Sequence, residues 1–82
     1  MSGKDNLKKL EKVLKKVLDC SADDLKDDNG PDQIVNWDSI THMELISKIE
    51  EEFDVEFDVD EINEIDKISS IKDALRKQQV VL

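Results

Sequence analysis

The sequence predicts an all-α domain, a small four-helix bundle with a long first loop and a short third helix. Apolar residues recur at helical spacing in four separate stretches. Turn-forming residues crowd one long segment, and no stretch shows the apolar–polar alternation of a β-strand. A chain of 82 residues is expected to form one domain, here 1–82, with its core at about 6–79. Four amphipathic helices joined by one long connection fit a small bundle.

The first helix is expected near residues 6–19. Its apolar residues repeat at helical spacing and lysines fill the other face; they are Leu7, Leu10, Val13, Leu14, Val17 and Leu18. Asn6 or Asp5 can serve as the N-cap, and residues 1–5 are expected to fray.

Residues 20–37 are rich in Asp, Asn, Gly and Pro, and predict a long loop with one helical turn around residues 22–25. A loop of this length in a compact domain is often functional. Trp37 is expected to pack as a lid over the bundle, with a partner contact as the alternative.

The second helix is expected at residues 39–53. At 100° per residue, one face is predicted to point inward and contains His42, Leu45, Ile46, Ile49 and Phe53. The opposite side is predicted to carry a stripe of Ile40, Glu44, Ser47 and Glu51, flanked by Met43 and Glu50.

The last two helices are shorter. Val59, Ile62 and Ile65 indicate a brief third helix. Ser70 followed by Asp73 resembles a capping box and predicts a final helix over roughly 70–79.

The charge is strongly acidic and unevenly distributed. The chain has a net charge of −9, and residues 38–66 hold 12 acidic residues against a single base, Lys48. Nucleic-acid binding is disfavoured because phosphates require Lys and Arg, whereas a partner with a basic docking face is favoured. Cys20 is the only cysteine, so no internal disulfide can form. We expect a cytoplasmic monomer without membrane insertion, because no apolar run is long enough to span a bilayer.

Ser39 is the main candidate site residue. Asp38 is a strong N-cap type whose carboxylate can accept the amide hydrogen of Ile40 or Thr41, leaving Ser39 as the first helical residue with its hydroxyl in solvent. A helix N-terminus favours a phosphodiester. From spacing alone, the alternative is that Ser39 is itself the N-cap.

The segment Asp38-Ser39-Ile40, followed by an acidic helix, resembles the acyl carrier protein family, which has an Asp-Ser-Leu core at this place. Ile40 replaces the usual Leu. Glu44, Leu45, Ile49 and the segment 50–53 also match the bacterial pattern, and the similarity covers nearly the whole chain. Trp37 before the core suggests a specialised bacterial member.

The resemblance implies a non-catalytic carrier. A phosphopantetheinyl transferase would attach 4′-phosphopantetheine from coenzyme A to Ser39, and the arm would hold acyl groups as thioesters. Partners would be acyl-transfer or condensing enzymes with basic docking surfaces, in a fatty-acid-like, specialised lipid or secondary-metabolite pathway. Their recognition would use Asp38, Ile40, Glu44, Glu50 and Glu51. Candidates for sheltering the acyl group are His42, Leu45, Ile46 and Ile49.

Other classes of protein share parts of this pattern. An aminoacyl carrier, of the D-alanyl or peptidyl type, shares the bundle and the modified serine. An unmodified acidic adaptor bundle would need Ser39 only as a cap. An EF-hand is disfavoured because the first and twelfth loop positions counted from Gly30 lack the required carboxylates. No residue is predicted as a metal ligand, and a loose divalent-ion site on the acidic surface is left open. A hydrolase is disfavoured because Ser39 and His42 point to different faces of one helix.

Overall fold

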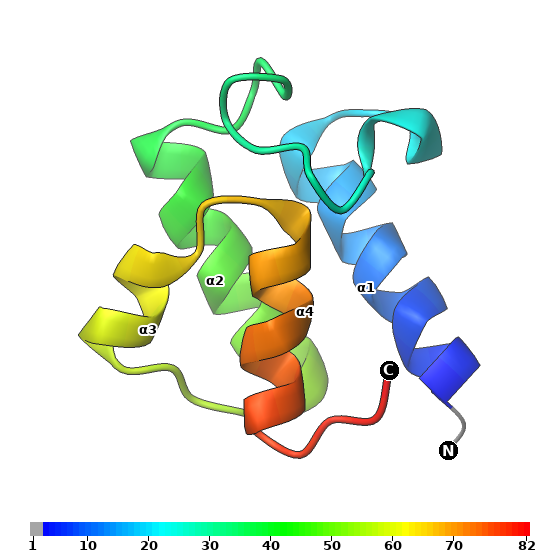
Figure 1. The fold of residues 1–82 in the computed structure, drawn as a ribbon, viewed down its shortest axis with the longest axis vertical. Coiled ribbons are helices and arrows are strands. Elements are labelled where there is room, and N and C mark those ends of the chain that lie inside the picture. Colours follow the sequence, from blue (N-terminus) through cyan, green and yellow to red (C-terminus); the bar gives the residue numbers. More distant parts are fainter. Residues whose placement is uncertain (1–2) are drawn as a thin grey trace.

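The computed structural model describes residues 3–82, and over that range the chain forms four α-helices and one 3₁₀ turn without a β-strand (Figure 1). The elements are α1 (Gly3–Leu18), η1 (Ala22–Asp24), α2 (Ser39–Phe53), α3 (Val59–Glu64) and α4 (Ile68–Lys77). The predicted all-α bundle, its long first loop and its short third helix are therefore confirmed. The bounds predicted for the second helix agree with α2.

α1 begins earlier than the sequence pattern indicates. Asp5 and Asn6 lie inside the helix, so the prediction that one of them is the N-cap is wrong. The Asn6 side-chain amide instead donates to the Val81 carbonyl oxygen at 2.7 Å. The end of the chain thus packs against the first turn of α1, a contact between residues 75 positions apart that local sequence does not reveal (Figure 1). The prediction that residues 1–5 fray is wrong for residues 3–5, which belong to α1, and residues 1–2 lie outside the described residues.

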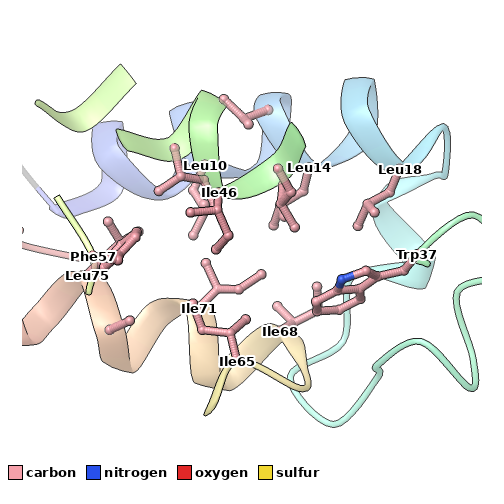
Figure 2. Close-up of a cluster of buried hydrophobic side chains, with 14 of the residues drawn as sticks. Leu10, Leu14, Leu18, Trp37, Ile46, Phe57, Ile65, Ile68, Ile71 and Leu75 are labelled. Atoms are coloured by element: carbon pink, nitrogen blue, oxygen red, sulfur yellow. The ribbon is translucent and has the colours of Figure 1, made fainter. Parts of the chain in front are cut away.

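The core is an aliphatic cluster closed by aromatic rings. Nine side chains are almost completely buried: Leu10, Leu14, Leu18, Leu45, Ile46, Ile49, Ile68, Ile71 and Leu75. Trp37 and Phe57 lie at opposite ends of the cluster in Figure 2. Only 2% of Trp37 is exposed, so the predicted packing as a lid is confirmed. Burying an aliphatic side chain contributes about 1.5–3 kcal/mol, so this cluster is the main source of stability.

α4 begins at Ile68, and the prediction of a capping box at Ser70 is wrong. Its N-cap residue, Lys67, makes no side-chain capping bond. The amides of Ile68 and Ser69 donate instead to carbonyl oxygens of the long loop, at 2.9 Å to Asn29 and 3.0 Å to Asp27. The loop backbone therefore satisfies the free amides at this helix end.

Gly30 makes this arrangement possible. It is buried, and a Cβ placed on it would lie 2.3 Å from the Asp66 carbonyl oxygen. The loop backbone thus lies directly on the link between α3 and α4. At its other end, the Asn36 side-chain amide donates to the Leu18 carbonyl oxygen at 3.0 Å. Held at both places, the loop delivers Trp37 and Asp38 to the start of α2.

Candidate functional site

The start of α2 is capped by Asp38. Its Oδ1 accepts hydrogen bonds from the Thr41 amide and the Thr41 hydroxyl, both at 2.9 Å. Of the two amides that the sequence offered for this role, the structure selects that of Thr41. The hydrogen bond from the Thr41 amide lowers the pKa of the exposed Asp38 carboxyl below its ordinary value, and the hydrogen bond from the Thr41 hydroxyl adds to this effect. Because Asp38 is the N-cap, the alternative that Ser39 is itself the cap is excluded.

Ser39 is the first residue of α2 and is exposed. Among the described residues, no group forms a hydrogen bond with its hydroxyl. The hydroxyl lies at the positive end of the helix dipole, where a negative phosphate is favoured. An accessible hydroxyl in this position fits a phosphate-linked group.

An open cavity of about 520 Å³ lies beside Ser39, between the long loop, α2 and the region of α3. Its lining is part apolar and part polar, and consists of Pro31, Trp37, Asp38, Ser39, His42, Met43, Ile62, Asn63, Ile65 and Asp66. Pro31, Asn63 and Asp66 were not predicted as site residues from the sequence. No local pattern could have done so, because they reach this place only when the loop and α3 pack against α2.

His42 forms the polar link in this cavity. Trp37 Nε1 donates to His42 Nδ1 at 3.0 Å, and the two rings are stacked with centroids 6.1 Å apart. His42 Nε2 lies 3.0 Å from the Ile62 carbonyl oxygen. An indole N–H can only donate and a carbonyl can only accept, so His42 is the neutral tautomer with its proton on Nε2. The half-buried ring therefore joins the loop, α2 and α3, and has no free nitrogen with which to act as a base on Ser39.

The other acyl-shelter candidates lie deeper. Leu45, Ile46 and Ile49 are at most 1% exposed and belong to the hydrophobic core. Of the four candidates, only His42 lines the cavity beside Ser39.

The docking candidates divide into two groups. Ile40 is 75% exposed, and Glu44 and Glu51 are also exposed on the outer side of α2. Glu50 is half-buried, and its Oε2 accepts the Phe57 amide at 2.8 Å. Glu50 therefore stabilises the turn after α2, which was not expected from the sequence.

A small helical bundle with an unbonded, exposed serine at the start of an acidic helix has the features of a domain that carries a group on that serine. Residues 8–75 match the family model of the phosphopantetheine attachment site. The chain belongs to this family, the acyl carrier protein domain, whose members are non-catalytic carriers with covalent 4′-phosphopantetheine. No curated protein sequence matches the chain significantly. Within residues 3–82, no helix is long and apolar enough to cross a membrane.

Proposed function

We propose that this chain is an acyl carrier protein in which the Ser39 hydroxyl holds the phosphopantetheine arm and presents acyl thioesters to partner enzymes. The observation that carries the proposal is that the cap of α2 and the free hydroxyl belong to two different residues. Asp38 caps the helix, so the exposed Ser39 hydroxyl is left without a partner among the described residues. When bound, the arm supplies a terminal thiol that holds the acyl group.

Loading breaks a phosphoanhydride bond of coenzyme A and forms a phosphate ester bond to Ser39. The Ser39 oxygen attacks the pantetheine-side phosphorus of coenzyme A, a bond from that oxygen to phosphorus forms, and the pyrophosphate link breaks. Adenosine 3′,5′-bisphosphate leaves, and the serine proton passes to a base. Both ring nitrogens of His42 are already engaged, so His42 is not that base, and we assign the base to the transferase.

Intact mass measurement tests the attachment site. The apo chain is incubated with coenzyme A and a broad-specificity phosphopantetheinyl transferase, alongside Ser39→Ala and the control Ser47→Ala. Ser47 is another exposed serine on the same helix. We expect one phosphopantetheine on the wild type and on Ser47→Ala, and none on Ser39→Ala. A folded wild type that several transferases leave unmodified would instead support the adaptor function.

The cavity beside Ser39 suggests what cargo the arm carries. The nitrogens of Trp37 and His42 are already hydrogen-bonded within the protein, so the free polar groups at the cavity include the carboxylates of Asp38 and Asp66. These carboxylates favour a short or polar acyl group over a long alkyl chain, because an alkyl chain gains little from contact with polar atoms. The same two carboxylates favour a second candidate function, an aminoacyl carrier, since an amino group would be positively charged.

Thioester lifetime distinguishes these cargoes. The holo chain is loaded with hexanoyl, 3-hydroxyacyl or D-alanyl groups, and hydrolysis is followed by mass. We expect the polar cargoes to be the more protected in the wild type, and His42→Leu to shift protection towards the hexanoyl form. Identical lifetimes in the wild type and in His42→Leu would exclude a role for His42 in cargo choice. Preferential protection of D-alanyl would support the aminoacyl carrier.

Docking is assigned to the outer side of α2. Ile40, Glu44 and Glu51 are exposed there and suit an enzyme with a basic surface around an apolar contact. Asp38 lies beside Ser39 and its lowered pKa keeps it ionised, so it adds a negative charge at the attachment point. Glu50 contributes its charge while its carboxylate holds the Phe57 amide.

A further inference from the structure

α1 differs in charge from the rest of the molecule. The helix contains six lysines and two acidic residues, Asp5 and Glu11, so its net charge is +4. The whole chain has a net charge of −9, so the remaining 66 residues carry a net charge of −13. These lysines lie outside the apolar face of α1, which buries Leu10, Val13, Leu14 and Leu18.

Part of this positive charge gathers in a groove between α1 and α2, which pack side by side (Figure 1). The groove has a volume of about 330 Å³ and contains one acidic residue, Glu52. We name it the lysine groove, and its other lining residues are Lys9, Lys12, Val13, Lys16, Val17 and Lys48. Lys48 is the only base of α2, so both helices contribute lysine to the same place.

The lysines of this groove are not paired with acidic side chains of the protein. Within residues 3–82, none of the four forms an ion pair, although the chain has 21 acidic residues. Lys9 lies over the Phe53 ring, 5.2 Å from its centroid, which limits how freely its side chain moves. The groove thus offers unneutralised positive charge above an apolar floor of Val13 and Val17.

The lysine groove is continuous with the docking side of α2. A second groove is lined by Glu44 and Glu51, two of the docking candidates, and it shares Val17 and Lys48 with the lysine groove. A protein that covers the outer side of α2 would therefore meet negative charge over α2 and positive charge towards α1.

We propose that the lysine groove binds an acidic segment of the enzyme that docks on α2, so that the interface is bipolar. Assigning the segment to such an enzyme rests on the proposed carrier function. An anionic membrane is a poorer occupant, because Glu44, Glu51 and Glu52 border the groove and would repel a uniformly negative surface. A protein can alternate basic and acidic residues to match both. An enzyme without the acidic segment leaves the lysines unmatched, and is thereby selected against.

The test uses a glutamate-rich helical peptide as the probe and amide NMR spectra of the isotope-labelled full chain. Lys12→Glu/Lys16→Glu changes the groove, and Lys26→Glu/Lys77→Glu makes the same change of net charge at exposed lysines that do not line it. Ser39→Ala and transferase loading are measured in parallel. Vesicles of phosphatidylcholine with phosphatidylglycerol form a separate arm.

We expect the peptide to shift amide signals around Lys12, Lys16 and Lys48 at low salt, and the shifts to fade at high salt. Affinity should fall about tenfold in the groove variant and less than about twofold in the control variant. Ser39→Ala should bind the peptide normally while failing to load, so a failure of the carrier function is separable from a failure of this proposal. Equal loss in both lysine variants, or no shift in the groove, would overturn it. Binding to the vesicles but not to the peptide would also overturn it and identify a membrane surface as the occupant.

Discussion

The N-termini of α2 and α4 both have free backbone amides, and these amides find their hydrogen-bond acceptors in different ways. α2 is capped by a neighbour in sequence, since Asp38 binds the amide and hydroxyl of Thr41. α4 is capped by residues about 40 positions away, since its first amides donate to the Asn29 and Asp27 carbonyl oxygens. The cap of α2 comes from within the same few residues and leaves Ser39 exposed. The distant cap makes the start of α4 depend on the packing of the long loop.

This difference matters for a carrier. The proposed attachment point must be open to enzymes, so no other part of the chain can cover it. The start of α4 is instead used to hold the loop, and the loop in turn positions Trp37 beside His42. Variants that remove either cap should therefore act on different parts of the molecule.

Gly30→Ala should have the largest effect, because its Cβ would lie 2.3 Å from the Asp66 carbonyl oxygen and push the loop off α4. We expect urea denaturation to show that the free energy of unfolding falls by roughly 1–3 kcal/mol. Hydrogen exchange should become faster at the amides of Ile68 and Ser69 in particular. Val35→Ala is the control, since Val35 is 92% exposed in the same loop and should change stability by less than about 0.5 kcal/mol. Equal effects of the two variants would contradict the distant cap.

Asp38→Ala should have an intermediate effect, confined to α2. We expect a lower melting temperature and faster amide exchange at Thr41, with Asp38→Asn retaining part of the cap. The pKa of Asp38 is lowered from 3.8, so its contribution is complete above that pH and is lost as the pH falls through the lower folded value. The difference in melting temperature between wild type and Asp38→Ala should therefore shrink in strong acid. A difference that grows on acidification would contradict the assigned hydrogen bonds.

Ser70→Ala should have the smallest effect. A capping serine would be worth about 1 kcal/mol, but Ser70 lies inside α4 and its hydroxyl only donates to the exposed Asp66 carboxylate at 2.9 Å. We expect the free energy of unfolding, measured in urea, to change by less than about 0.5 kcal/mol. A loss as large as that of a true N-cap would restore the capping box that the sequence indicated.

The sequence was sufficient where neighbours along the chain decide the structure. Helical periodicity predicted the bounds of α2, the inward direction of His42 and the outward direction of Ile40 and Glu44. These features depend on 100° steps and on one strong cap, which act over four or five residues.

The sequence was insufficient where distant segments meet. Nothing near Glu50 indicates that it accepts the Phe57 amide, and nothing near Asn6 indicates that Val81 lies beside it. The cavity next to Ser39 and the lysine groove likewise combine residues from different elements. Their members become neighbours only after the core has closed.

Local geometry and composition account for the helices, the acidic character of α2 and the position of Ser39 after a strong cap, so the sequence alone predicts these features. The tertiary structure decided which amides the loop satisfies, which tautomer His42 adopts and where the lysines of α1 converge with Lys48. Hydrogen-bond partners and charge clusters of that kind are set by burial of the shared aliphatic core, which brings distant backbone and side-chain groups together and leaves their polar atoms to be paired with whatever lies there.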